Sequence, residues 1–247
     1  MLFIYGMIDT ILLGFMRTQS EVGFYTAAVK IAILVGTLPS ILHQTFFPSL
    51  SAYSKTREWR DVLGLYIIVL TLSGLAVGGA GLLAAREILV IVYGARYLGG
   101  VTAMQILFFN AVVSFLAVAF ANPLIVIKKE KQYLLVVASG AIVNIILNIS
   151  LIPSFGIEGA AVATVLSEVT VLITAAFILR KHVHFRTGKL ILLSMTHTAI
   201  SFAAGEVGVT LGFDGIYSGL IFISVFLILF LFFRKNYRKL TGEIVLS

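Results

Sequence analysis

The sequence predicts an all-α integral membrane protein with about eight transmembrane helices. Of its 247 residues, 60% are hydrophobic and only 12% are charged, and the mean hydropathy is +1.07. Soluble globular proteins are about half apolar and about a quarter charged. The charged residues also fall in short clusters between apolar runs of about 20 residues, the length that crosses a bilayer. Eight such runs and short loops fill the chain, so no sizeable soluble domain is expected.

Composition and motifs exclude several classes of protein. A net charge of +7 would suggest a nucleic-acid partner in a soluble chain, but here the positive charge lies between apolar spans, and no nucleic acid is expected. The chain has no cysteine, so disulfides, thiolate metal sites and cysteine nucleophiles are excluded. It also lacks HExxH, GxSxG and Walker A motifs. We therefore expect no enzyme activity, metal or cofactor, and transport energy from a gradient or a separate subunit.

The first two predicted spans form a helical hairpin over residues 1–48, with the polar turn RTQSE between them. The first span holds about 16 residues, fewer than the roughly 20 that cross a bilayer comfortably. The start of the chain does not resemble a cleavable signal peptide, because a basic segment and a small-residue cleavage site are missing. We expect the chain to begin inside a helix of a longer protein.

Each arm of this hairpin carries one charge, Asp9 in the first and Lys30 in the second. A charge near the bilayer centre is costly, so such a residue is a functional candidate by default. At about 1.5 Å per residue, Asp9 lies roughly 12 Å from the turn at Arg17, and Lys30 roughly 13 Å from Glu21. The two side chains therefore reach similar depth and could pair. A structural ion pair and a role in transport both fit this pattern.

The third span, residues 62–85, contains the run of small residues SGLAVGGAG. Gly74 and Gly78 are four residues apart, so they share one helix face and allow another helix to approach closely. The next segment, residues 86–98, is amphipathic and too short to cross. It predicts an interfacial helix, with Tyr93 and Tyr97 near the lipid headgroups.

Two prolines are expected to bend their spans. Pro39 lies in the second span, and Pro123 follows Asn122 in the fourth, residues 100–127. Proline removes one backbone hydrogen bond and kinks a helix, which membranes tolerate where neighbouring groups or water satisfy the freed carbonyl. Both prolines are therefore candidate hinges.

The fifth and sixth spans carry polar side chains at mid-depth on either side of a turn at residues 153–159. Asn144 and Asn148 share one face of the fifth span, and Glu168 lies in the middle of the sixth. Asn144 and Glu168 are expected at comparable depth, where a protonated carboxyl group could donate a hydrogen bond to the amide. A structural hydrogen bond is one interpretation, and a polar cavity wall or proton site is the other.

Basic residues predict the orientation of the chain. The fifth to eighth spans are expected at residues 132–153, 160–179, 190–207 and 216–233. The loops after the second, fourth, sixth and eighth spans hold three, three, four and four of the 18 Lys and Arg residues. With eight spans, all four clusters fall on one side, and the side rich in Lys and Arg is cytoplasmic. The C-terminus is therefore predicted to be cytoplasmic.

Two stretches carry a family resemblance. They are IDTILLGFMRTQSEVGFYTAAVKI (8–31) and VVASGAIVNIILNISLIPSFGIEGAAVATVLSEV (136–169). The first is similar to the start of the second half of polysaccharide flippases in the multidrug/oligosaccharidyl-lipid/polysaccharide exporter superfamily. The second is similar to their repeated pattern of an Asn-rich helix, Ile-Pro, Gly, Gly-Ala-Ala and a small-residue helix. FFPSLS (46–51) and the Asn122–Pro123 helix before a basic loop also fit.

The resemblance implies a fold with two lobes around a central cavity. Residues 1–185 would form the C-terminal lobe, with about six spans, and the N-terminal lobe would be missing from this sequence. Residues 186–247 would form two accessory spans and a basic cytoplasmic tail. Alternating access would rock one lobe against the other, with Pro39 and Pro123 permitting bending.

The resemblance also implies a function in the bacterial or archaeal cytoplasmic membrane. Family members move a polyprenyl-diphosphate-linked oligosaccharide between leaflets for surface polysaccharides such as O-antigen, and polysaccharide polymerases or assembly proteins are implied partners. A cationic wall would suit the diphosphate, with Lys30 and Arg17 as candidates, while Asp9 would hold Lys30 or couple a cation or proton. The remaining candidate cavity residues are Asn144, Asn148 and Glu168.

Four other functions are compared with this interpretation, and the last of them is excluded. A multidrug exporter of the same superfamily would favour acidic cavity groups, which Asp9 and Glu168 allow but Lys30 disfavours. A peptidoglycan-precursor exporter of the same superfamily is also an alternative that the sequence does not exclude. A non-transporting membrane scaffold predicts that polar residues at mid-depth tolerate apolar replacement. A membrane-embedded glycosyltransferase would need a sizeable extramembrane loop, and no loop here is long enough.

Overall fold

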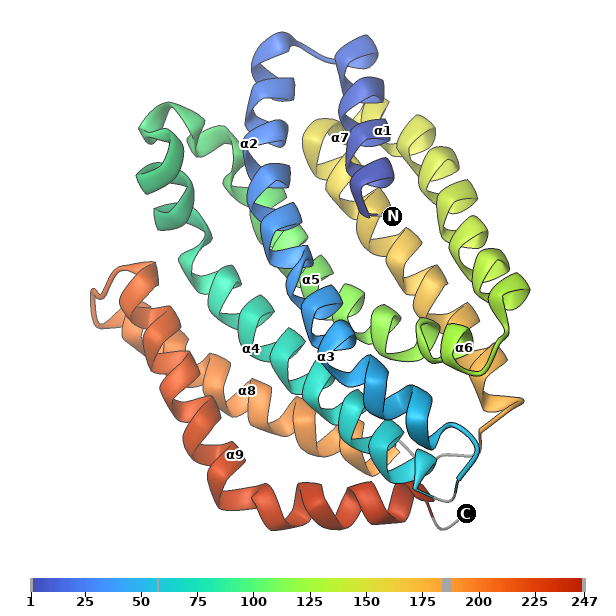
Figure 1. The fold of residues 1–247 in the computed structure, drawn as a ribbon. Helices are drawn as coiled ribbons and strands as arrows, with labels where there is room; N and C mark the ends of the chain where they lie inside the picture. The colour runs from blue at the N-terminus through green and yellow to red at the C-terminus, as the bar shows by residue number, and fades with distance from the viewer. Residues whose placement is uncertain (1, 57, 184–187, 246–247) are drawn as a thin grey trace.

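The computed structural model describes residues 2–56, 58–183 and 188–245, and every regular element in these ranges is a helix (Figure 1). The elements in chain order are α1 (Leu2–Met16), α2 (Gln19–Gly36), α3 (Leu38–Tyr53), α4 (Trp59–Tyr93), the 3-10 turn η1 (Ala95–Gly100), α5 (Val101–Ala121), α6 (Pro123–Val126), α7 (Glu130–Arg180), α8 (Gly188–Thr210) and α9 (Gly215–Val245).

Each predicted span coincides with helix in the described ranges. In order, the predicted spans correspond to α1, α2 with α3, α4, α5 with α6, the two arms of α7, α8 and α9. Five described segments are long and apolar enough to cross a membrane: Gln19–Tyr53, Trp59–Tyr93, Ala95–Val126, Glu130–Arg180 and Gly215–Phe233. The 15-residue α1 and α8 are not among them. The protein is therefore an all-α, multi-pass membrane protein.

The longest element, α7, folds back on itself at Gly156. This residue has φ 57° and ψ −132°, so the helix is interrupted there and two arms run side by side in opposite directions (Figure 1). Glycine is needed because a residue with a Cβ rarely adopts a positive φ. The predicted turn at residues 153–159 is confirmed.

The predicted interfacial helix at residues 86–98 is wrong. Residues 86–93 continue α4 without a break to Tyr93, and the chain then turns at Gly94, with φ 89°, into η1. One face of this segment packs inward, where Leu89 is fully buried, while Ile91 and Val92 on the other side are 70% and 56% exposed. An amphipathic pattern cannot by itself distinguish a surface helix from the end of a long packed helix.

Both prolines lie where a span is broken. The second span divides at Thr37 into α2 and α3, and Pro39 lies in the first turn of α3. The fourth divides at Asn122 into α5 and α6, and Pro123 begins α6. Proline is tolerated in a first helical turn because its missing N–H would have no partner there. The predicted breaks are present, and the hinge role stays a prediction.

The small residues of α4 let two helices approach it closely. A Cβ on Gly74 or Gly78 would lie 2.6 Å from Phe115 Cβ or 2.3 Å from Val112 Cγ2, both on α5. A Cβ on Gly79 would lie 2.3 Å from the Phe222 ring on α9. Lipid is as apolar as the side chains, so helices in a membrane are held together largely by the van der Waals contacts that such close approach provides. The predicted packing face at Gly74 and Gly78 is confirmed, and Gly79 serves a second face.

This packing predicts opposite effects of one substitution at two glycines. Gly78→Ala is expected to lower the free energy of unfolding by about 1–3 kcal/mol, because the new methyl group would overpack the contact with α5. Gly23→Ala is the matched control: its Cβ would meet nothing within 4 Å, and alanine raises helix stability by about 0.5–1 kcal/mol over glycine. Fluorescence of Trp59, the single tryptophan, can follow unfolding in detergent. Equal effects at both sites would contradict the close contact.

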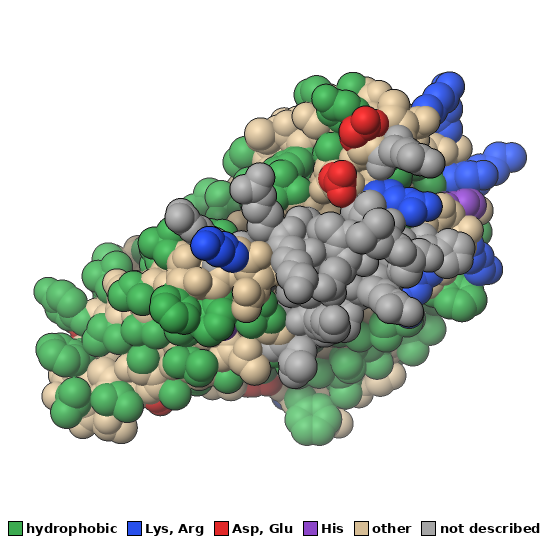
Figure 2. All heavy atoms as spheres, turned by 90° about the horizontal axis from the view of Figure 1, so that it is seen from below, with side chains coloured by type: hydrophobic (Ala, Val, Ile, Leu, Met, Phe, Trp, Pro, Cys, Tyr) green, Lys and Arg blue, Asp and Glu red, His purple; other side chains and the backbone are tan. Residues whose placement is uncertain are grey.

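Several turns rich in basic residues lie at one end of the molecule. Figure 1 shows the α3–α4 and α6–α7 turns and the end of α9 toward the lower right, opposite the α1–α2 turn. His182, beyond α7, hydrogen-bonds Gln132 near its start at 2.9 Å, so both ends of α7 lie together. Figure 2, which views this end from below, shows Lys and Arg side chains gathered along its right-hand side. This arrangement agrees with the predicted alternation of spans. Residues 184–187 of the third basic cluster lie outside the described residues.

Candidate functional site

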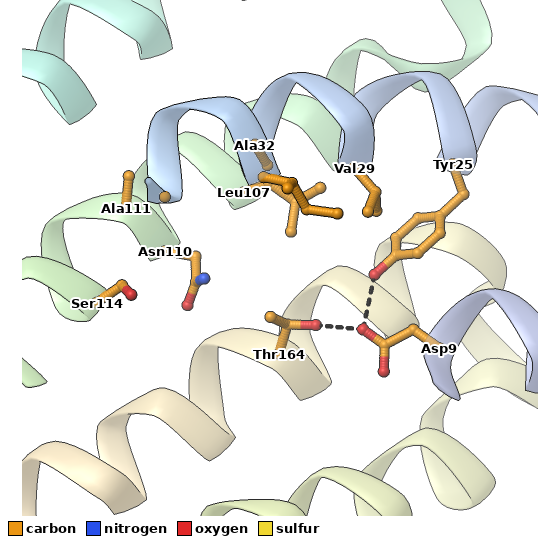
Figure 3. A pocket seen from close by; sticks show the side chains of 11 residues that line it. Asp9, Tyr25, Val29, Ala32, Leu107, Asn110, Ala111, Ser114 and Thr164 are labelled. Atoms are coloured by element: carbon orange, nitrogen blue, oxygen red, sulfur yellow. Dashed lines mark hydrogen bonds between the residues drawn. The ribbon is translucent and has the colours of Figure 1, made fainter. Parts of the chain in front are cut away.

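A buried carboxylate, Asp9 of α1, is the centre of the candidate site. Its side chain is 0% exposed and accepts three hydrogen bonds. Tyr25 Oη and Thr164 Oγ1 donate to Oδ2 at 3.0 and 2.6 Å (Figure 3), and Asn148 Nδ2 donates to Oδ1 at 2.7 Å. These donors come from α2 and from the two arms of α7. Four helical segments therefore converge on one acidic group.

The fold brings Asn148 and Thr164 together because each lies eight residues from Gly156, on opposite arms of α7. Positions equidistant from the bend of a hairpin lie at equal depth, here about 12 Å from it. The α1–α2 turn is fixed by a capping box, in which Thr18 Oγ1 accepts from the Glu21 N–H and Thr18 N–H donates to Glu21 Oε2. This short turn sets Tyr25 of α2 opposite Asp9.

The three donors to Asp9 are neutral, and two further oxygens nearby lack a partner. Oδ1 of Asn144 and Oδ1 of Asn148 are buried without a hydrogen bond. Carboxylate, amide and hydroxyl oxygens are the ligands that hard cations prefer. Within the described residues no group of three or more His, Cys, Asp or Glu side chains could hold a metal ion. One acidic group with neutral oxygens can instead take a monovalent cation or a proton.

A cavity of about 40 Å³ lies beside Asp9. Asp9, Tyr25 and Thr164 form its polar wall at one end, and Asn110 and Ser114 of α5 form it at the other (Figure 3). Asn110 is 6% exposed, and its Oδ1 has no hydrogen-bond partner. The cavity is large enough for water, which needs at least about 10–15 Å³. Asp9 is thus buried from the surface and adjacent to a polar space.

The predicted ion pair between Asp9 and Lys30 is wrong. Asp9 accepts hydrogen bonds from neutral groups instead, while Lys30 lies on the exposed face of α2. The reason is rotation about the helix axis. Tyr25 reaches Asp9, and a residue five positions further along a helix points about 140° away from it. Sequence spacing gave the depth of Lys30 but not its direction.

Arg17 lies at the α1–α2 turn and does not line the cavity beside Asp9. Its Nε is 3.7 Å from Glu21 Oε1, and both side chains lie against Gly156, where a Cβ would come within 2.8 Å of Arg17 Nη2. The pair therefore covers the bend of α7. This position supports a structural contact between two turns.

Glu168 and Asn144 do not meet as predicted. Asn144 is fully buried and donates instead to Ser167 Oγ at 3.2 Å. Adjacent residues on a helix point about 100° apart, so Glu168 faces another direction. It lines a second cavity, of about 160 Å³, with Tyr133 of the first α7 arm and Ser114 of α5. The direct hydrogen bond is therefore wrong, and the position in a cavity wall agrees with the second interpretation.

Sequence reasoning missed Tyr25 and Thr164 as partners of Asp9 and left Asn110 without a role. Tyrosine and threonine are common in apolar helices and carry no charge to mark them. One signal was present for Thr164, since it lies four residues before Glu168 and eight after the Gly156 bend, opposite Asn148. No comparable signal singled out Tyr25.

Relatives of known name match the sequence, although no protein-family model does. Probable flippase AglR of Haloferax volcanii is 33% identical over 172 residues, which cover 66% of this chain and 35% of AglR. Probable low-salt glycan biosynthesis flippase Agl15 of the same organism is 30% identical over 168 residues, which cover 67% of this chain and 36% of Agl15. The chain belongs to the flippase family of the multidrug/oligosaccharidyl-lipid/polysaccharide exporter superfamily. The predicted resemblance is confirmed.

This flippase-family chain spans about a third of the length of the curated relatives that it matches. Its fold matches the solved structure of lipid II flippase MurJ in an inward closed conformation, with a TM-score of 0.82 and 17% identity. The match covers 94% of this chain and 51% of MurJ. At this identity the likeness concerns the fold alone, and the predicted exporter fold is confirmed. The relatives are named as flippases, which are transporters and not enzymes.

Proposed function

We propose that the chain forms one lobe of a flippase for polyprenyl-diphosphate-linked oligosaccharide in surface polysaccharide biosynthesis. The membrane would be the cytoplasmic membrane of an archaeal or bacterial cell, with the C-terminus on the cytoplasmic side. Residues 1–185 would supply the lobe, and residues 186–247 two accessory helices and a basic tail. An N-terminal lobe, whether joined to this chain or separate, would complete the central cavity. Polysaccharide polymerases or assembly proteins are proposed partners.

The observation that carries this proposal is the buried Asp9 site in a chain whose named relatives are flippases. A carboxylate with 0% exposure and only neutral donors is expensive to ionise at this depth, and packing alone does not require a charge. We propose that Asp9 binds the coupling ion, a proton or a monovalent cation. Asn144 and Asn148 would supply amide oxygens to a bound cation, since both oxygens lack partners.

Lys30 is proposed to bind the diphosphate. It lies on the exposed face of α2, where it is available to a substrate or a second lobe. Leu34, one turn further along the same face, is 71% exposed, so the face combines a cation with apolar surface. A polyprenyl diphosphate presents the complementary pair, an anionic headgroup on an apolar chain. Arg17 is less suited to this role because it already pairs with Glu21.

The proposal is tested by depleting the complete flippase and measuring lipid-linked oligosaccharide in the cytoplasmic leaflet. Depletion should cause it to accumulate, and the wild-type gene should clear it. Lys30→Ala is expected to slow clearance about tenfold or more, because a charge-assisted contact to a phosphate contributes about 1.5–3 kcal/mol.

The matched control is Lys55→Ala. Lys55 is an exposed lysine in the α3–α4 turn, away from the face of α2 that carries Lys30, so its removal should leave clearance unchanged. No accumulation on depletion would favour a scaffold over a transporter. Full clearance by the Lys30→Ala variant would remove the diphosphate role while leaving the flippase assignment intact.

A further inference from the structure

The second cavity, beside Glu168, has no role in the function proposed above. Its volume is about 160 Å³, and its lining comes from α3, α5, the α5–α6 break and both arms of α7. Half of the lining residues are polar: Ser40, Ser114, Asn122, Tyr133 and Glu168. A space kept only by imperfect packing in a membrane protein would be lined by apolar side chains. The polar lining indicates a space that holds water or ions.

Among the described residues that line this cavity, Glu168 is the acidic one. It is 6% exposed, and its side chain lies in the wall of the cavity. Buried polar groups are nearly always hydrogen-bonded, so a carboxyl group in a cavity wall favours a hydrogen-bonding or charged partner in that cavity. Water, a proton or a cation would serve, whereas an anion would be repelled.

The two cavities share Ser114, which lines both of them. Two facing helices carry polar residues in register on either side of this point. Asn110 and Ser114 lie one turn apart on α5, and Thr164 and Glu168 one turn apart on the second arm of α7. The unpartnered Oδ1 of Asn110 lies on the Asp9 side of Ser114. Polar side chains therefore line both cavities on either side of Ser114.

The far end of the second cavity approaches the end of the molecule that carries the basic turns. Asn122 lies at the α5–α6 break, and the Tyr133 N–H bonds the Lys129 carbonyl at 3.0 Å. Tyr133 is thus one helical turn from the α6–α7 turn. The opposite end of the cavity, at Ser114, meets the space beside Asp9. Together the two cavities reach from that end of the molecule to the buried carboxylate.

We propose that the Glu168 cavity is a cation-selective access path, through which a small cation or proton passes between the basic end of the molecule and Asp9. This inference rests on the proposed role of Asp9 as the coupling-ion site. Glu168 attracts cations into the path, and Asn110 and Ser114 hydrate the narrow point between the cavities. The path gives Asp9 one-sided access, which coupled transport requires of an ion site that alternates between the two sides.

The natural absence of cysteine makes the path directly testable. Ser114→Cys exchanges a hydroxyl for a thiol of similar shape, and Ala117→Cys places a second reporter in the same cavity. In vesicles that expose the basic end, each variant is treated with cationic 2-aminoethyl or anionic 2-sulfonatoethyl methanethiosulfonate. The free thiol 2-mercaptoethanol gives the intrinsic ratio of the two rates, and Thr56→Cys, in the exposed α3–α4 turn, reports an accessible thiol at the basic end. Leu166→Cys, 42% exposed on α7 and outside the lining of both cavities, reports a thiol away from the path in an apolar span.

Relative to 2-mercaptoethanol, the cationic reagent should modify Ser114→Cys about tenfold faster than the anionic one, because an acidic wall concentrates cations. Adding Glu168→Gln should remove most of this preference while labelling continues, and Leu166→Cys should stay unmodified. Unreactive thiols at both Ser114→Cys and Ala117→Cys would overturn the path, as would a preference that survives Glu168→Gln. Adding Asp9→Asn should leave labelling unchanged, because labelling tests the path alone. Transport by the Asp9→Asn variant tests the coupling site. A failure of the path can therefore be distinguished from a failure of the coupling site.

Discussion

Replacing Asp9 by asparagine is expected to leave the chain folded and to reduce ion-coupled transport by at least about 100-fold, or about 2.7 kcal/mol. The substitution removes the charge that would bind a cation, and an amide cannot take up a proton at physiological pH. The hydrogen bonds can persist. Tyr25 and Thr164 can donate to the new amide oxygen. Asn148 can turn its own unpartnered Oδ1 toward the new Nδ2, and in turning it gives up its bond to the Asn144 carbonyl.

The stability of this variant separates function from structure. An ionised carboxylate buried without a cationic partner costs several kcal/mol, so its neutral replacement should unfold at the same free energy as the wild type or a higher one. A residue retained for packing would show the reverse pattern, with transport kept and stability lost. The structural site therefore predicts that stability and activity respond differently to one substitution.

Two measurements on reconstituted protein check this expectation: transport driven by an imposed Na⁺ or proton gradient, and unfolding followed by Trp59 fluorescence. Asp61→Asn is the matched control, since Asp61 is exposed in the first turn of α4 and should keep full transport. Undiminished gradient-driven transport by the Asp9→Asn variant would rule out Asp9 as the coupling site. Loss of folding in that variant would indicate a structural carboxylate.

The helices could be predicted from the sequence because bilayer thickness imposes a length on apolar runs. The packing face of α4 could also be predicted, because Gly74 and Gly78 are four residues apart and therefore lie on the same face of the helix. The continuation of α4 to Tyr93 could not be predicted from the sequence. Burial of Leu89 depends on neighbours that the local pattern does not show.

The site was only half predictable, because the sequence gives the depth of a residue in a helix more reliably than its direction. Asp9 and Asn148 are in the site as expected. Lys30 has suitable depth but points away, and Glu168 misses Asn144 by a rotation of one residue. Errors of this kind arise because about 100° separates neighbouring residues, while the crossing angles of helices shift the facing positions.

Gly156→Ala is expected to lower the free energy of unfolding by about 2–4 kcal/mol and to disrupt the Asp9 site. An L-residue held at φ 57° and ψ −132° costs about 1–3 kcal/mol. The new Cβ would also lie 2.8 Å from Arg17 Nη2 and 3.2 Å from Glu21 Oε1, so the Arg17–Glu21 pair would have to move. The effect should reach Asn148 and Thr164, because each is fixed at its depth by the same bend.

Gly212→Ala separates the backbone cost from this effect on the site. Gly212 has a positive φ of 89°, and a Cβ there would meet nothing within 4 Å. It lies in the α8–α9 turn, so it should lose about 1 kcal/mol and keep full transport. Gly156→Ala should lose transport even in conditions where it remains folded, since Asp9 would lose donors from one or both arms of α7. Equal transport by the two variants at equal folded fraction would show that the bend does not set the geometry of the Asp9 site.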